Sequence, residues 1–516
     1  MGVMALGLLS GCGSKKDTDD GDNTLTVGIP LYGSITDFEN VPFTKYIEEN
    51  LGIKLKFVNY VKNASDRQQQ LTLQATGGEK LPDVLWGFQE TSRITVYEFG
   101  DAGYFQDLTE LIDKYADNYK AQFAKLDKEE QDYINDRGTS GSGGFYGMPL
   151  YCAFDVVDDL QNMMYINQSW LDKLGLKAPT TIEELRAVLE AFKNGDPNGN
   201  GKADEIPMLG RNISAYVINA FQYFDTTYPV NVENGKTTPS FTSNEYRQAL
   251  IYLNELCKQG LYSDMSITLS NNNEFMSLIT PTDGVSKVGI WCGHPLSYTD
   301  ISSSILREYT ALGALSDATG KGGYTVVHPR TLMFCGFITR DCKNPELAMK
   351  FLDFFYKDDT VTWMRHGAEG VNWQRGTGTN VLGTEAFFEK IETESTDPVG
   401  WGINGNAIFT TANYMPVYNE NSNNDRLLAA TWEVQNAGKR ITESTAHLVY
   451  TQEEEDQRTS LEGTIKSEMS SARDLFITGK KDPKSDADWN AYLKTIEDLK
   501  LSELVALYQT VYDRAK

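Results

Sequence analysis

The sequence LTVGIP (residues 25–30) opens a stretch in which strand-like and helix-like segments alternate. Apolar residues recur at every second position of this segment, as in a strand that is buried on one face. A helix-like segment follows at residues 42–50, and LGIKLKFV (51–58) leads into a second strand. A second helical pattern covers residues 65–76, and LPDVLW (81–86) enters a third strand. This order predicts an α/β fold that is built on a parallel sheet with crossover helices.

The segment GSGGFYGMPLY (141–151) interrupts this alternation. Its glycines predict a surface turn, and the residues after them predict a strand that crosses between two lobes. The sequence beyond it is mostly helical, with apolar side chains on one helical face from Ile182 to Phe192. Thr180 and Glu183 have the spacing of a capping box at the start of that helix. Further helices are expected at residues 243–259, at residues 344–355 and from residue 485 onward.

Length and charge limit the classes of protein that the chain can represent. A chain of 516 residues is too long for one ordinary core and indicates two or three domains. The net charge of −25 argues against a nucleic-acid partner, which requires clustered Lys and Arg, and it also disfavours a strongly anionic ligand. After the N-terminal segment, no stretch has the roughly 20 apolar residues that a membrane-spanning helix needs.

Cysteine and histidine are too scattered to form a disulfide scaffold or a zinc site. Apart from Cys12 the chain has five cysteines, an odd number with wide spacing, and we expect them to be buried free thiols. The four histidines show no metal-ligand spacing, so we expect no zinc site.

The N-terminal residues have the composition of an export signal. Residues 4–9 form a short apolar run, and the sequence LSGC (9–12) follows directly. This sequence resembles the bacterial lipobox, in which the cysteine receives a diacylglycerol and becomes the new N-terminus. Residues 13–24 are small, polar and charged and are expected to form a flexible linker. We therefore predict a signal peptide at residues 1–12, a lipid anchor on Cys12 and a position on the extracellular face of the cell membrane.

Several short blocks follow one another along the chain. They are TVGI (26–29), LPDV (81–84), GMP (147–149), MYIN (164–167), WLDKLG (170–175), PTTIEEL (179–185), NPELAMKFL (344–352) and GAEGVNW (367–373). Their order resembles that of the family-1 extracellular solute-binding proteins, the receptor components of ABC importers. The last block is similar to the branch that includes oligosaccharide receptors of Gram-positive bacteria.

This resemblance implies a two-lobed, periplasmic-binding-protein-like α/β fold with hinge-crossing segments and a helix-rich C-terminal lobe. We assign residues 25–150 and about 305–345 to the N-terminal lobe, and residues 151–304 and about 346–516 to the C-terminal lobe. The expected function is capture of a carbohydrate, in particular an oligosaccharide, for delivery to the permease subunits of an ABC importer. The protein is expected to be a monomer and to have no enzymatic activity.

The segment DPNGNGKADE (196–205) has the spacing of a calcium-binding loop. Oxygen-bearing side chains stand at positions 1, 3, 5 and 9, and the glycine at position 6 permits a sharp turn. Pro207 replaces the usual glutamate at position 12, and Glu205 can supply that carboxylate instead. A solvated turn is the alternative, but the resemblance also implies a structural calcium here. The predicted ligands are Asp196, Asn198, Asn200, the main-chain carbonyl of Lys202, Asp204 and Glu205.

Aromatic residues at the ends of predicted strands are candidates for stacking on a sugar. Saccharides present C–H faces to aromatic rings and hydroxyls to polar side chains around them. Ligands of open α/β sheets gather beyond the carboxyl ends of the strands, where several of these residues stand. Trp170, by contrast, shares a helical face with Leu171 and Leu174 and is assigned to the core. The candidate ligand contacts are Trp86, Phe88, Tyr151, Trp291, Glu369, Asn372 and Trp373.

Other functions remain open at this stage. A surface glycoside hydrolase needs two carboxylates roughly 5–10 Å apart, and 72 acidic residues can supply such a pair. No segment has a GxSxG or Walker motif. The same fold can also bind a peptide or another small solute, or pass its ligand to a membrane sensor.

Overall fold

The structure is a computed structural model, and part of the chain is left undescribed. Cys12 and most of the predicted linker lie outside the described part, as do residues 152–162. The described residues are 23–31, 35, 37–151, 163–269, 271–325, 332–391, 400–401, 415–439, 441, 445, 448 and 450–515.

The N-terminal lobe is built on a five-stranded sheet in the order β2-β1-β3-β11-β4. Strand β1 (Thr24–Pro30) pairs in parallel with β2 (Lys54–Tyr60) and with β3 (Val84–Trp86). Strand β11 (Leu332–Ile338) returns antiparallel to β3 and also pairs with β4 (Met148–Tyr151). The predicted parallel arrangement of the first three strands is confirmed.

The two crossover helices begin and end at residues that explain their limits. Helix α1 (Pro42–Leu51) has proline in its first turn and ends at Gly52, whose φ of 65° suits a residue without a side chain. Helix α2 (Ala64–Gly77) is capped by Asn63, whose side chain accepts a hydrogen bond from the Asp66 amide. Other helices of this lobe are α3 (Arg93–Asp101), α4 (Thr109–Tyr115), α5 (Asp117–Phe123), α6 (Lys128–Gly138), α15 (Pro345–Phe354) and α16 (Asp358–His366).

The C-terminal lobe has a four-stranded sheet in the order β10-β5-β9-β6. These strands are β5 (Met163–Asn167), β6 (Ile206–Gly210), β9 (Val288–Gly293) and β10 (Tyr309–Ala311). Trp170 lies in the core of this lobe, as predicted. The helices around the sheet are α8 (Gln168–Leu174), α9 (Ile182–Asn194), α10 (Ile213–Ile218), α11 (Asn244–Lys258), α12 (Met265–Thr268), α13 (Asn272–Ile279), α14 (Pro295–Tyr298), η1 (Ser304–Glu308), α17 (Asn423–Ala437), α18 (Gln452–Ile477), α19 (Asp486–Asp498) and α20 (Leu501–Arg514).

The cap of helix α9 lies one residue later than predicted. The Thr181 side chain, not that of Thr180, accepts a hydrogen bond from the main chain, at the Glu184 amide. Glu184 in turn accepts hydrogen bonds from the amide and hydroxyl of Thr180, each at 2.8 Å. Two adjacent threonines offer two possible registers, and packing of Ile182 and Leu185 into the core fixes the later one.

The lobe boundaries differ from the predicted ones in the second half of the chain. Strand β10 pairs with β5, so residues assigned to the N-terminal lobe from about residue 305 belong to the C-terminal sheet. Helices α15 and α16, assigned to the C-terminal lobe, instead contribute Phe351 and Trp363 to the N-terminal core. The described chain is thus in the C-terminal lobe up to residue 325 and in the N-terminal lobe from residue 332. The assignment of residues 332–345 was correct, whereas those of residues 305–325 and of the two helices were wrong.

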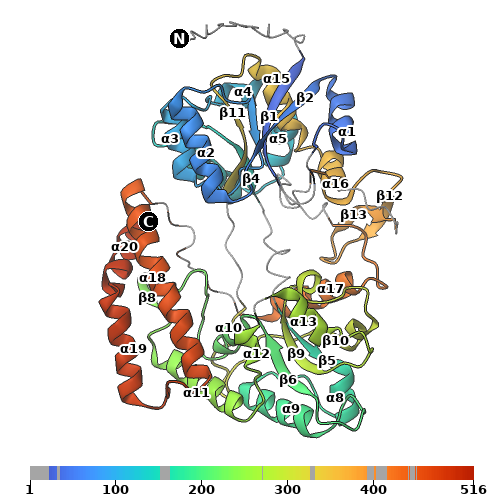
Figure 1. Ribbon diagram of the computed structural model, residues 1–516, viewed down its shortest axis with the longest axis vertical. Helices are drawn as coiled ribbons and strands as arrows, with labels where there is room; N and C mark the ends of the chain where they lie inside the picture. The colour runs from blue at the N-terminus through green and yellow to red at the C-terminus, as the bar shows by residue number, and fades with distance from the viewer. Residues whose placement is uncertain are drawn as a thin grey trace, which may run out of the picture.

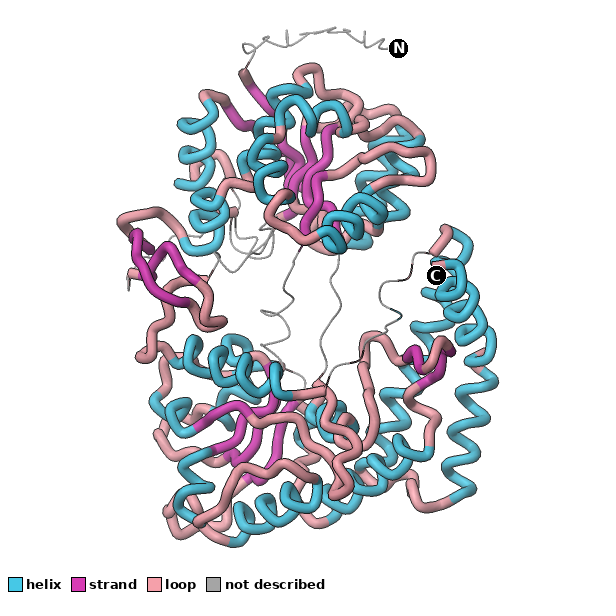
Figure 2. The backbone as a smooth tube through the Cα atoms, turned by 180° about the vertical axis from the view of Figure 1, so that it is seen from behind, coloured by secondary structure: helices cyan, strands magenta, loops and turns pink. Residues whose placement is uncertain are grey.

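The two lobes lie one above the other, and α18, α19 and α20 rise beside the lower, C-terminal lobe toward the upper one (Figure 1). The hairpin of β12 (Trp373–Thr379) and β13 (Glu385–Lys390) stands apart from both main sheets (Figure 2). A second hairpin joins β7 (Val230–Glu233) and β8 (Lys236–Pro239). Among the described helices, none is long and apolar enough to span a bilayer.

Candidate functional site

Two of the predicted ligand contacts, Trp86 and Phe88, lie inside the N-terminal lobe. The Trp86 side chain is 0% exposed and stacks on Phe355 with ring centroids 3.8 Å apart. Phe88 is 1% exposed and meets the edge of Tyr60 at 5.1 Å. In the described conformation these rings pack in the core and do not reach a ligand.

Tyr151, Trp291 and Trp373 are also buried. Tyr151 and Trp291 are 0% exposed and Trp373 is 1% exposed. Trp291 stacks on Tyr165 at 4.3 Å, and the Trp373 indole N–H donates to the Gly367 carbonyl at 2.7 Å. Trp291 lies within β9 and Trp373 begins β12, and all three side chains pack against neighbouring residues in the described conformation. A ligand contact by any of them stays a prediction.

Glu369 and Asn372 shape the turn that leads into β12. The Glu369 carboxylate is 46% exposed and accepts a hydrogen bond from Arg375 Nε at 3.0 Å. The Asn372 side chain accepts a hydrogen bond from the Ala368 amide at 3.0 Å. These contacts satisfy both side chains within the turn, and neither residue lines the two hollows described below.

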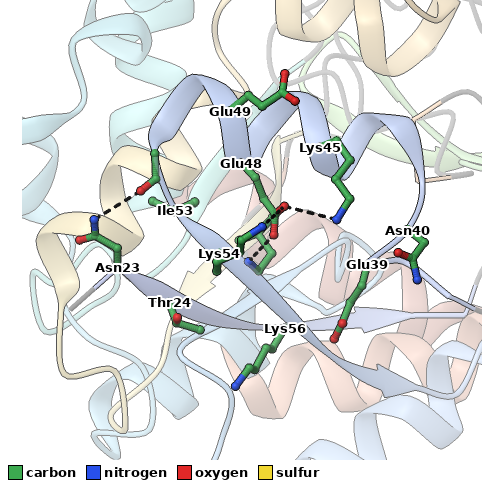
Figure 3. A pocket seen from close by; sticks show the side chains of 12 residues that line it. Asn23, Thr24, Glu39, Asn40, Lys45, Glu48, Glu49, Ile53, Lys54 and Lys56 are labelled. Carbon is green, nitrogen blue, oxygen red and sulfur yellow. Dashed lines mark hydrogen bonds and ion pairs between the residues drawn. The ribbon is translucent and has the colours of Figure 1, made fainter. Parts of the chain in front are cut away.

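A groove of about 970 Å³ lies at the edge of the N-terminal sheet, between α1 and β2 (Figure 3). Its charges already pair within the protein, because Glu48 binds Lys54 at 3.0 Å and Lys45 at 3.5 Å. Burial opposes ionisation of Glu48, but the Leu55 amide and Lys54 outweigh it and hold the pKa of Glu48 below its ordinary value. The residues that line the groove include no aromatic ring, so it does not suit a sugar.

A smaller pocket of about 210 Å³ lies between the two lobes and is rich in tyrosine. The N-terminal lobe contributes the start of α3, and the C-terminal lobe contributes the loop before β7 and the faces of α18 and α20. We call it the interlobe pocket. Its lining residues are Ser92, Arg93, Ile94 and Tyr97 from the first lobe, and Tyr228, Thr445, Leu448, Tyr450, Glu455, Arg458 and Tyr508 from the second.

Tyr450 forms the most distinctive part of this lining. Its ring meets the Tyr508 ring edge-on at 6.1 Å, and the Arg458 guanidinium lies over it at 5.2 Å. Burial raises the pKa of Tyr450 well above its ordinary value, so the hydroxyl stays protonated. That hydroxyl is buried and makes no hydrogen bond with any described residue. A buried hydroxyl without a partner is costly, so this one is available to a ligand.

The opposite wall is fixed by contacts within the N-terminal lobe. Ser92 caps α3 by accepting a hydrogen bond from the Thr95 amide at 3.1 Å. The Tyr97 hydroxyl donates to the main-chain carbonyl of Arg137, and burial raises the pKa of Tyr97. Tyr97 is therefore held with its ring at the pocket wall.

The charges on the C-terminal wall are balanced. Arg458 binds Glu455 through two nitrogens and also donates to Glu462. Lys466 pairs with Glu462 as well, so two cations face two carboxylates. Burial acts against the Arg458 charge, but these carboxylates outweigh it and raise the pKa of Arg458.

The interlobe pocket combines aromatic rings with hydrogen-bonding groups, which is the chemistry that binds a hydroxyl-rich ring. It is smaller than the roughly 300–1,000 Å³ that encloses a whole drug-sized ligand, so it suits one end of a longer molecule. None of the predicted contacts lies in its lining. Its residues come from segments hundreds of positions apart, and the only signal along the sequence was the abundance of tyrosine.

The predicted calcium loop has the folded form that such a loop requires. The Asp196 carboxylate accepts hydrogen bonds from the amides of Asn200 and Gly201, and Asn198 accepts one from the Asn200 amide. The Asn200 side chain accepts from the Lys202 amide at 2.8 Å. These bonds turn the chain around its own polar side chains.

The loop carries the carboxylates of Asp196, Asp204 and Glu205, and the charges of Lys287 and Lys202 act on Asp204. Asp204 accepts hydrogen bonds from the side-chain amides of Asn198 and Asn200, at 3.1 and 3.0 Å. One carboxylate oxygen of Glu205 is buried without a hydrogen-bond partner among the described residues. Burial and then the charges of Asp196 and Asp204 raise the pKa of Glu205. A bound Ca²⁺ would supply the missing partner, and rotation of the two amides would turn oxygens toward it. No ready-made group of three or more His, Cys, Asp or Glu ligands exists in the described chain.

The prediction of buried free thiols is confirmed for three of the four described cysteines. Cys292, Cys335 and Cys342 are free and buried, whereas Cys257 is free and only partly buried. Burial raises the pKa of each of these four thiols. Cys152 lies outside the described residues.

Part of the chain is similar to a family model and to curated proteins. Residues 32–271 match the model of the bacterial extracellular solute-binding proteins. The fructooligosaccharide ABC transporter substrate-binding protein FusA of Streptococcus pneumoniae is 30% identical over 281 residues, which are 50% of this chain and 50% of FusA. The lipoprotein LipO of Bacillus subtilis is 25% identical over 50% of this chain and 49% of its own length. The chain thus matches about half the length of these curated relatives.

Solved structures match over nearly the whole chain. A solute-binding protein of Bifidobacterium longum infantis, described as binding human milk oligosaccharides (HMO), has a TM-score of 0.74 and 22% identity, over 96% of this chain and 99% of its own. A FusA structure, described as an EF-hand mutant with fructo-nystose, has a TM-score of 0.72 and 21% identity over the same shares. These likenesses confirm the two-lobed α/β fold.

Proposed function

We propose that this chain, whose residues 32–271 match the model of the bacterial extracellular solute-binding proteins, is a membrane-anchored receptor for an oligosaccharide. In this function the two lobes hold the sugar between them and pass it to the permease subunits of an ABC importer. The protein binds its ligand without chemical turnover.

The interlobe pocket carries this proposal. Four tyrosines from both lobes surround a space in which the buried Tyr450 hydroxyl has no partner. A sugar ring offers C–H faces to such rings and a hydroxyl to such a group. Because both lobes line the pocket, a bound sugar would be contacted by both and would favour their approach.

The relatives support a carbohydrate over a peptide. FusA is described as a fructooligosaccharide-binding protein, and the similar Bifidobacterium protein as binding HMO. A peptide receptor on the same fold is the alternative, since tyrosine-lined pockets also hold peptides.

Cys12 and the calcium loop complete the proposal. A lipid on Cys12 would tether the receptor through residues 13–24, which raises its local concentration at the permease. LipO is described as a lipoprotein. A calcium ion held by Asp196, Asn198, Asn200, the Lys202 carbonyl, Asp204 and Glu205 would neutralise the converging carboxylates and fix the loop. A FusA structure is described as an EF-hand mutant, which supports a calcium loop in this family.

A thermal-shift screen of the purified protein against oligosaccharides and peptides tests the function. A ligand that binds only the native state raises the melting temperature, by the equivalent of about 2.7 kcal/mol at 100 times its Kd. We expect at least one oligosaccharide to raise the Tm of the native chain and to have a smaller effect on Tyr450→Ala. Tyr418→Phe, an exposed tyrosine outside the pocket, is the matched control and should respond like the native chain.

Three results would contradict the proposal. A Tm shift produced by peptides alone would make the protein a peptide receptor. Release of shorter sugars during incubation would make it a glycoside hydrolase. An oligosaccharide response that Tyr450→Ala leaves unchanged would move the binding site away from the interlobe pocket.

A further inference from the structure

Two arginines on the N-terminal side of the interlobe pocket have no acidic partner. Arg93 lines the pocket, and Arg137 lies directly behind it, bonded through its main-chain carbonyl to the Tyr97 hydroxyl. Among the described residues, no carboxylate lies within ion-pair distance of either guanidinium, and one terminal nitrogen of Arg137 is buried without a hydrogen bond. Burial, followed by the charge of Arg93, lowers the pKa of Arg137. The charge of Asp136 offsets this lowering only in part, and Asp136 lies outside ion-pair distance of the Arg137 guanidinium.

The remaining charges around the pocket do not cancel them. On the C-terminal wall, Glu455 and Glu462 are matched by Arg458 and Lys466. Asp225, beyond Tyr228, is buried and accepts a hydrogen bond from the Thr227 amide at 2.7 Å. The C-terminal wall thus has one carboxylate more than it has cations, and this single charge does not cancel the two guanidiniums, although the whole chain carries a net charge of −25.

We propose that the interlobe pocket binds an acidic oligosaccharide and that Arg93 and Arg137 receive a sugar carboxylate. This inference rests on the proposed function and specifies its substrate class. A guanidinium pair offers the planar donors that bind a carboxylate, and the surrounding tyrosines hold the ring that bears it. The local charge overrides the expectation, drawn from the net charge, that anionic ligands are disfavoured.

The Tyr97 and Tyr133 rings explain why the arginines stay in place without a ligand. The Arg137 guanidinium lies over the Tyr133 ring at 5.3 Å, a cation–π contact that supports its charge without neutralising it. The bond from Tyr97 to the Arg137 carbonyl fixes the end of α6 against α3. The cations are therefore positioned before the ligand arrives, which lowers the cost of binding.

Matched pairs of ligands test the proposal. Uronate trisaccharides of galacturonate, glucuronate and mannuronate are titrated by calorimetry, each beside its carboxyl-reduced neutral counterpart. We expect at least one acid to bind tenfold or more tightly than its counterpart, with an affinity that falls as salt is added. R93Q and R137Q should each remove most of this preference while leaving the affinity for the neutral sugar within about threefold, and R93K and R137K should keep part of it.

The controls separate the possible failures. R340Q, whose arginine pairs with Asp341 outside the pocket, should keep the preference. Equal binding of acid and neutral sugar, or binding of the neutral sugar alone, would overturn the acidic specificity but not the receptor function. An equal loss of affinity for the acidic and the neutral sugar in R93Q and R137Q would make the arginines general contacts between the lobes. That result would also overturn the acidic specificity. Binding of no saccharide would overturn both proposals.

Discussion

Two sets of aromatic side chains in this molecule differ in what holds them. Trp86 at the end of β3 and Trp291 within β9 lie inside the lobes, where each is 0% exposed and stacks on a neighbouring ring. Tyr97 and Tyr450 line the interlobe pocket, where Tyr97 is held by its bond to the Arg137 carbonyl and Tyr450 by the Tyr508 ring and the Arg458 guanidinium. The first set is fixed by core packing, and the side chains of the second stay partly accessible. Proximity to a strand end therefore does not by itself mark a ligand contact.

Trp86→Ala should have the largest effect and should act on stability. Removal of a buried tryptophan leaves a cavity beside Phe355 and is expected to cost about 3–5 kcal/mol of unfolding free energy. Chemical denaturation of the native and variant proteins measures this loss. Tyr97→Ala, a partly exposed residue of the pocket, should cost clearly less. The distinction between the two sets fails if Trp86→Ala keeps its stability and loses only ligand binding.

Calcium should have the next largest effect on stability. Its predicted site is the loop at residues 196–205, whose ligands are close together in the sequence. At ten times its Kd, calcium is expected to stabilise the native protein by about 1.4 kcal/mol, which chelation removes. Asp204→Ala should abolish the rise in Tm that calcium produces. Tm values with calcium and with chelator, for the native chain and the variant, give the result. A variant that still responds fully to calcium would place the ion elsewhere.

The calcium effect should also depend on pH. The pKa of Glu205 is raised above 4.5 in the folded, calcium-free protein. The contribution of its protonated carboxyl group to the free energy of unfolding is therefore fully present below pH 4.5 and is lost as pH rises through the folded pKa. Calcium binds the ionised carboxylate and so offsets this loss of stability at higher pH. The rise in Tm on adding calcium should therefore be larger at pH 7 than at pH 4.5. The same rise at both values would exclude Glu205 as a ligand.

The sequence anticipated the local features of this fold better than the distant ones. Periodicity located β1, α1, β2, α2 and β3, because each depends on neighbours within a few residues. The calcium loop likewise depends on ten consecutive positions. The interlobe pocket joins Arg93 to Tyr508, and the lobe crossing after residue 325 depends on which sheet accepts β10 and β11. Spacing along the chain contains no information about either choice.

Tyr450→Phe should change ligand affinity and not the stability of the unliganded protein. A hydrogen bond from this hydroxyl to a sugar is expected to contribute about 0.5–1.5 kcal/mol, so the Kd should rise about 2- to 12-fold. The unliganded Tm should stay the same or rise, since the variant removes a buried hydroxyl that has no partner. Calorimetric titration and a melting curve measure the two quantities. A lower unliganded Tm would mean that the hydroxyl serves the protein's own packing.

Glu454→Gln should have the smallest effect and should show how the C-terminal wall is supported. Glu454 binds both terminal nitrogens of Arg514 at 2.7 Å, which ties the start of α18 to the end of α20, the helix that carries Tyr508. Arg514, followed by the Thr451 amide, holds the pKa of Glu454 at about 2, despite partial burial. The contribution of ionised Glu454 to the free energy of unfolding is present above pH 4.5 and is lost as pH falls through about 2. Glutamine keeps the bond to the Thr451 amide but loses the charge, so we expect a loss of about 1 kcal/mol or less at pH 7. The difference between variant and native unfolding free energies should shrink on acidification. If Glu454→Gln lowers the ligand affinity less than Tyr450→Phe does, the ion pair between Glu454 and Arg514 supports the pocket wall only indirectly. If it lowers the affinity more, this ion pair, and not Tyr450, is the main determinant of the site.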